Sequence, residues 1–202
     1  MKKFIVIIPL LIITFFIGFY AKDIFLPSKK DTEAVKPLEP VKPKQTKDEK
    51  IKFEEIKKRK EKNMDEVNKY LEQITPIIQD ITDTYNRIVL VNERMVEEIY
   101  YLDSPEYQQD VLSIATYLES LALQIKKIDP GTNNSVKHAH DYMVNAAEYL
   151  GPFAVLFKSY MLSGRTQSDL QTMLRNKDEV TGNVQQAEKV IDEYVRELTL
   201  LQ

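Results

Sequence analysis

Hydrophobic residues recur alternately three and four positions apart over most of the chain, the spacing that places them on one stripe of an α-helix. Four such series occur, and they cover residues 64–102, 107–128, 139–160 and 170–201. The polar exceptions within them are Asn92 and Lys177. We expect Asn92 to fix the register of the core and the long side chain of Lys177 to reach solvent from the edge of its stripe. The pattern predicts four amphipathic helices.

Residues that cap or stop helices separate the four series. Ser104-Pro105 has the N-cap hydroxyl and the proline at the first helical position that begin a helix. Asp129-Pro130-Gly131 should stop the second helix, Ser135 should cap the third, and Thr166 or Ser168 should cap the fourth. Each connection is therefore short.

Two prolines fall inside predicted helices. Pro76 either kinks one long first helix or starts a new one, and the heptad phase that continues across it favours the kink. Gly151-Pro152 should bend the third helix or break its hydrogen-bond ladder. Because residues 153–157 are apolar on all sides, we expect this bend to be buried.

Helices joined by short turns pack antiparallel and bury their apolar stripes together. The predicted fold is all-α: an antiparallel four-helix bundle, built like a coiled coil, over residues 51–202. Its first and last helices are the longest, and we expect their ends to form a two-helix stalk that projects beyond the bundle. The few glycines agree with long helices, since the chain has five among 202 residues.

The N-terminal segment, residues 1–21, is predicted to be a transmembrane signal-anchor. Residues 4–21 carry no charge, and a helix of this length spans about 27 Å, close to the hydrocarbon core of a bilayer. The apolar residues expected to contact lipid are Phe4, Ile5, Leu10, Leu11, Phe15, Phe16 and Tyr20. Lys2 and Lys3 favour a cytoplasmic N-terminus, so the chain would cross the cell membrane once with the bundle outside.

The alternative interpretation is a secretory signal peptide that is cleaved and releases the protein. The apolar run is longer than such peptides usually have, and bulky Phe19 lies two positions before Ala21, which is unfavourable for cleavage. Both interpretations place the bundle on the outer side of the membrane.

Residues 22–50 are predicted to be an extended, charged linker. Pro37, Pro40 and Pro43 recur at the three-residue period of polyproline II, which remains extended without internal hydrogen bonds. Residues 22–62 carry a net charge of +5 and residues 64–202 a net charge of −10. The basic cluster at 57–60 is either a solvated helix face, which we favour, or a contact for anionic polymers or lipid head groups. The acidic bundle should repel nucleic acids.

The residues that usually carry chemistry are sparse. The chain has no cysteine, and His138 and His140 lie two positions apart, on different faces of a helix, so we interpret them as exposed helix residues. No glycine-rich phosphate loop occurs. We therefore expect no catalytic, cofactor or metal-binding residues. Tyr100 and Tyr101 are the candidate interaction patch, at one end of the bundle.

These features favour a non-enzymatic docking module of the bacterial cell envelope, anchored in the lipid bilayer through residues 4–21 and bound to another envelope protein. The layout and the composition, rich in Lys and Ile and poor in Arg, are similar to those of small envelope proteins of Gram-positive bacteria. The alternative is an extracytoplasmic ligand-sensing bundle. Since no second apolar run of about 18 residues follows, such a bundle would signal through a partner membrane protein.

Overall fold

The computed structural model describes residues 47–98, 100–163 and 166–200, without the side chains of 47–50. All regular secondary structure in this part of the chain is helical, with no strand, as the sequence predicts. Its elements are α3 (Lys47–Glu97), the short 3₁₀ helix η1 (Tyr101–Asp103), α4 (Pro105–Ile125), α5 (Asn134–Leu162) and α6 (Gln167–Leu200).

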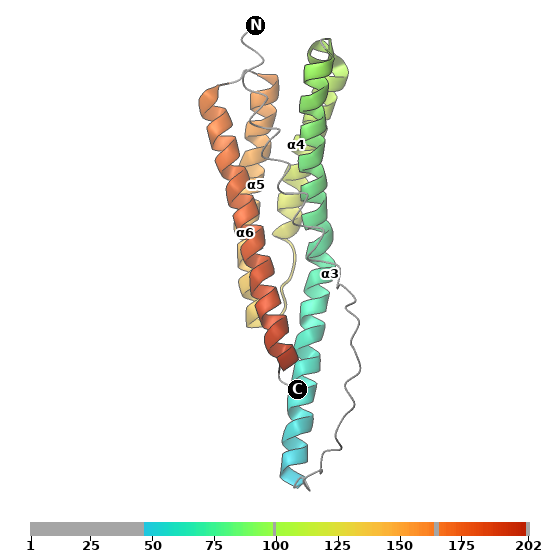
Figure 1. Cartoon of the computed structure of the whole chain (residues 1–202), viewed down its shortest axis with the longest axis vertical. Helices are drawn as coiled ribbons and strands as arrows, with labels where there is room; N and C mark the ends of the chain where they lie inside the picture. Colours follow the sequence, from blue (N-terminus) through green and yellow to red (C-terminus); the bar gives the residue numbers. More distant parts are fainter. Residues whose placement is uncertain (1–46, 99, 164–165, 201–202) are drawn as a thin grey trace, which may run out of the picture.

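The four α-helices run alternately up and down, so that helices adjacent in sequence are antiparallel (Figure 1). α5 packs most closely on α6 and then on α4, whereas α3 approaches α4 and especially α6 less closely. As predicted, the first and last helices are the longest, with 51 residues in α3 and 34 in α6. The N-terminal part of α3 continues alone beyond the end of α6 (Figure 1). The expected stalk therefore has two helices only where α6 lies beside α3, and a single helix beyond that point.

The core confirms the heptad assignment. In α4 the predicted stripe is buried from Tyr107 to Ile125, and in α5 it is buried from Ala139 to Tyr160. Asn92 is also buried, at a position facing the other helices. The expectation for Lys177 is wrong, because its side chain is 6% exposed and does not extend into solvent. Burial lowers the pKa of this lysine, an effect that neighbouring Asp178 opposes.

Both internal prolines are accommodated without ending a helix. α3 continues through Pro76, so the alternative in which a new helix starts there is wrong. α5 likewise continues through Pro152, and the expectation of a buried bend is wrong because Pro152 is exposed and Val155 is 56% exposed. Both proline rings lie on the solvent side of their helices, where water can satisfy the carbonyl group that loses its amide partner.

Side-chain caps begin three of the helices. The Ser104 hydroxyl accepts a hydrogen bond from the Tyr107 amide at 3.1 Å, and that of Thr166 accepts one from the Asp169 amide at 3.1 Å, as expected. The third predicted cap is wrong: Asn133, two residues before Ser135, begins α5. Its Oδ1 accepts from the amides of Ser135 and Val136 at 2.9 and 3.2 Å.

The predicted anchor, residues 1–21, lies outside the described residues, as does the linker up to residue 46. α3 begins at Lys47, inside the range assigned to the linker. Among the helices of the described part, none is both long and apolar enough to cross a membrane.

Candidate docking groove

An apolar groove of about 530 Å³ lies between α3 and α6, with Met143 of α5 at its base. Its α3 wall extends from Met64 to Ile78 and its α6 wall from Ala187 to Val195. The apolar residues that line it are Met64, Val67, Tyr70, Leu71, Ile74, Ile78, Met143, Ala187, Ile191 and Val195. The groove is therefore an extension of the hydrophobic core to the surface of the bundle.

The groove arises from the sizes of the side chains at the α3–α6 contact. Ala187 occupies a core position of α6, where the preceding and following members of the stripe are Val184 and Ile191. An alanine at this position leaves space that a larger side chain would fill, and α3 does not approach closely enough to close it. The base is well packed, because Val67, Ile74 and Met143 are almost completely buried.

One rim of the groove is negatively charged. Glu188 and Asp192 lie one helical turn apart on α6, and both line the opening. Burial raises the pKa of the Glu188 carboxyl, and repulsion from Asp192 raises it further. The opposite rim, on α3, has the neutral polar side chains of Asn68 and Thr75. A positive group at the α6 rim would relieve this unfavourable environment of the Glu188 carboxylate.

A tyrosine–histidine pair supports the groove from inside. Tyr70 lines the groove, its hydroxyl lies 3.5 Å from Nδ1 of His140 on α5, and the two rings meet edge to face. His140 is only 7% exposed, so its interpretation as an exposed residue is wrong; the stripe of α5 is wide enough to include it. Burial lowers the pKa of His140. His138 is exposed, as expected, with its ring against Tyr142.

The predicted tyrosine patch is divided by the structure. Tyr100 is 84% exposed, whereas Tyr101 is buried with its ring against Tyr107. The Tyr101 hydroxyl donates to Asp110 at 2.5 Å, and the Arg94 guanidinium lies over the Tyr101 ring at 4.1 Å. Tyr101 thus closes the end of the core, and the candidate patch is reduced to Tyr100.

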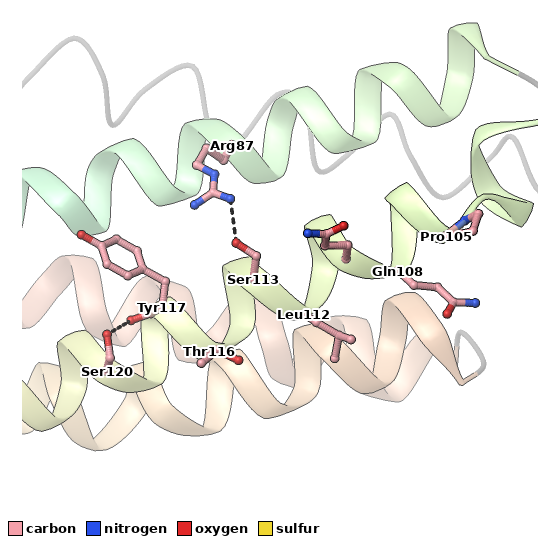
Figure 2. Close-up of a pocket in the computed structure, with 9 residues that line it drawn as sticks. Arg87, Pro105, Gln108, Leu112, Ser113, Thr116, Tyr117 and Ser120 are labelled. Atoms are coloured by element: carbon pink, nitrogen blue, oxygen red, sulfur yellow. Dashed lines mark hydrogen bonds between the residues drawn. The ribbon is translucent and has the colours of Figure 1, made fainter.

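A second hollow, of about 770 Å³, lies along the outer face of α4 beside α3 (Figure 2). Arg87 extends from α3 and donates to the Ser113 hydroxyl at 3.1 Å. Most of the remaining lining is neutral and polar, and comes from a single helix: Pro105, Gln108, Gln109, Leu112, Ser113, Thr116, Tyr117 and Ser120. Unlike the α3–α6 groove, this hollow has no buried residue in its lining and no pair of carboxylates, and Arg87 is its one charged lining residue.

Two buried polar atoms have no hydrogen-bond partner in the described part of the chain, Tyr85 Oη and Asn92 Nδ2. Both belong to α3 and lie above the groove on the same stripe. Burial, and then the charge of Asp178, raise the pKa of Tyr85, so its hydroxyl remains protonated. Such atoms lower the free energy of unfolding, because they form hydrogen bonds with water in the unfolded chain that are not replaced in the fold.

The N-terminal part of α3, residues 51–62, is a solvent-exposed helical arm that precedes the α3 wall of the groove in the same helix. Its helix extends beyond the end of α6 (Figure 1). Phe53 is 59% exposed, and Ile51 and Ile56 are exposed to a similar extent. Six basic and three acidic residues give the arm a net charge of +3. Its basic cluster is mostly solvated, with Lys57, Lys58 and Arg59 exposed and Lys60 partly buried.

Comparison with known proteins adds no relative, since no family model, curated protein or solved structure matches the chain significantly. Sequence reasoning missed the groove and its acidic rim. The available signal was Ala187, a small residue in an otherwise bulky stripe, next to two carboxylates one turn apart. The described residues contain no cluster of three or more histidine or acidic side chains placed to hold a metal ion.

Proposed function

We propose that the protein is a docking module of the bacterial cell envelope that binds a basic amphipathic helix in its α3–α6 groove. The observation that carries this proposal is an open apolar groove with a pair of carboxylates along one rim. In helix-in-groove recognition, apolar side chains three, four and seven positions apart enter such a groove, while polar residues contact its edges.

The dimensions of the groove suit this kind of ligand. Its α3 wall from Met64 to Ile78 is about 21 Å long, which corresponds to about four turns of a bound helix. Lysine or arginine on the bound helix would reach Glu188 and Asp192. The ion pairs would form at a partly desolvated carboxylate, where a positive charge has more effect than in bulk water.

The cellular location is part of the proposal and depends on the sequence of residues 2–21. The uncharged run and the preceding lysines support a single membrane anchor, a cytoplasmic N-terminus and a bundle outside the cell. We also propose that the groove acts by binding and not by catalysis. The Tyr70 hydroxyl faces His140 inside the bundle, the other polar side chains of the lining are Asn68, Thr75, Glu188 and Asp192, and the rest of the lining is apolar.

The second candidate function is ligand sensing. The groove volume of about 530 Å³ lies within the range of small-molecule sites. A small cationic amphiphile would satisfy the same apolar base and acidic rim, and a partner membrane protein would transmit the signal. A small ligand would fill the groove without supplying a protein helix, so no protein could be crosslinked to the rim of the groove.

A cysteine on the groove rim tests occupancy directly, since the natural chain contains no cysteine. Asn68→Cys places a thiol on the lining, and Lys69→Cys places one on the next, exposed residue outside the lining. In intact cells we expect Asn68→Cys to react several-fold more slowly with a thiol reagent than it does in dilute purified protein. Lys69→Cys should react equally in both.

Filling the groove is the matched control for this measurement. Ala187→Phe places a large ring where the groove has its smallest side chain, and it should abolish the protection of Asn68→Cys in cells. Circular dichroism should show the same helix content in both proteins. Equal reactivity of Asn68→Cys in cells and in dilute protein would contradict a docking role for the groove.

A further inference from the structure

The exposed arm at residues 51–62 has the properties of a ligand for the groove. Phe53, Ile56, Lys57 and Lys60 are spaced i, i+3, i+4 and i+7 and therefore share one face of the helix. That face combines large apolar side chains with lysines, and the groove combines an apolar base with two carboxylates. Phe53 and Ile56, both more than half exposed and one turn apart, form an apolar surface on the arm that a complementary chain can cover.

The arm cannot reach the groove of its own chain. The arm and the α3 wall of the groove follow each other in one continuous helix, from Ile51 to Ile78. Folding the arm back would require breaking α3 near Asn63. The occupant of the groove, if it is this segment, must come from a second copy.

The lengths of the two segments match in an antiparallel pair. From first to last residue, the arm of 12 residues is about 17 Å long, and the groove wall of 15 residues is about 21 Å long. A two-fold axis that crosses α3 near Asn63 places Ile56 of one copy level with Tyr70 of the other. The same operation places the second arm in the first groove, so both grooves are filled at once.

We propose that two copies of the chain form a closed antiparallel dimer in which the arm of each, residues 51–62, occupies the α3–α6 groove of the other. This inference rests on the proposed docking role of the groove and names its occupant. Phe53 and Ile56 cover the apolar base, and Lys57 and Lys60 lie along the rim that carries Glu188 and Asp192. Because the contact is reciprocal, it closes at two copies and does not continue into a filament.

Paired cysteines in the full-length chain test this arrangement. Lys57→Cys/Asp192→Cys combines an arm position with the groove rim, and Lys57→Cys/Glu193→Cys uses the next residue of α6, outside the lining. Within one chain, position 57 is separated from the groove by the part of α3 that leads to it, too far for a disulfide. We therefore expect mild oxidation to give a covalent dimer with the first pair and several-fold less with the second.

Two further variants identify what the groove holds. Phe53→Asp/Ile56→Asp changes only exposed side chains and should abolish the crosslink, as should Ala187→Phe. A crosslink that persists in both would overturn the dimer, as would a ladder of higher oligomers or no crosslink at all.

A further measurement separates the two proposals: the reaction of Asn68→Cys with the thiol reagent, in cells whose protein also carries Phe53→Asp/Ile56→Asp. Loss of protection together with the crosslink supports the second copy as the occupant. Protection that remains would show that another molecule fills the groove, which overturns the dimer and leaves the docking role intact. Absence of protection in the natural background would contradict both.

Discussion

At the scale of single residues, the core contains several polar residues, of which the hydrophobic pattern indicates Asn92 and Lys177 but not His140. Asn92, Lys177 and His140 are all buried, and Tyr85 Oη has no partner among the described residues. Each lowers the free energy of unfolding unless a specific contact offsets its desolvation. Such residues make a helical core specific for one register at some cost in stability.

His140 makes stability dependent on pH in a predictable direction. Its pKa in the folded protein is below the ordinary value of 6.5, because burial has a larger effect than the charges of Asp141 and Asp129. As the pH falls below 6.5, the unfolded chain therefore takes up a proton before the folded protein does. The part of the free energy of unfolding that depends on neutral His140 is present above that pH and is lost as the pH falls further. His140→Gln should reduce the loss on acidification, measured by chemical denaturation.

His138→Gln is the control for this prediction. His138 lies on the same helix but is exposed, so its replacement should leave the pH dependence of unfolding unchanged. If both variants or neither altered that dependence, burial of His140 would not be the source.

At the scale of helices, the ends depend on side chains that a sequence pattern locates only approximately. Ser135 is a residue type that often caps helices, but Asn133 lies two residues earlier and is the observed cap. Its side-chain oxygen Oδ1 accepts hydrogen bonds from two amides at the start of α5 that have no partner within the helix. Asn133 also donates to the Tyr194 hydroxyl at 2.8 Å, which ties the start of α5 to α6. A contact between two helices therefore contributes to selecting the cap.

Replacing each candidate cap separates the two assignments. Asn133→Ala should lower the free energy of unfolding by about 1–2 kcal/mol, since the helix loses its cap. Ser135→Ala should change it by less than about 0.5 kcal/mol, because Ser135 already lies inside the helix. Thermal unfolding followed by circular dichroism provides the measurement, and a larger effect at Ser135 would contradict the observed cap.

At the scale of the whole molecule, charge and apolar surface are distributed unevenly along the chain. The basic arm projects from one end of an acidic bundle (Figure 1). The α3 wall of the groove, from Met64 to Ile78, follows the arm in the same helix. This polarity favours association between arm and groove over association between two bundles, whose like charges repel each other. The proposed anchor is attached at the end of the chain that carries the arm.

The proposed anchor and topology predict how the full-length protein fractionates. It should remain with membranes and retain Met1, because residues 4–21 form an uncharged run long enough to cross the bilayer. Protease added to intact spheroplasts should degrade residues 64–202. A mature N-terminus near Lys22 in the medium would instead support secretion, and full protection until lysis would reverse the topology.

The helical class, the four helices and most of the core follow from the amino-acid sequence alone. These properties are local or periodic: an apolar stripe on an α-helix is visible in one segment, and a cap such as Ser104 needs only residues within one turn. The stripes of α4 and α5 were therefore predicted almost residue by residue. The continuous heptad phase likewise anticipated that α3 would pass through Pro76.

Features that depend on the distance between helices follow only from the three-dimensional packing. Whether His140 is buried, and whether the small Ala187 side chain opens a groove or is covered, depends on how closely α3, α5 and α6 approach each other. The pairing of that groove with Glu188 and Asp192 follows from the same geometry. A heptad pattern specifies which face of a helix is buried, but the space left between two faces depends on side chains from every helix that meets there.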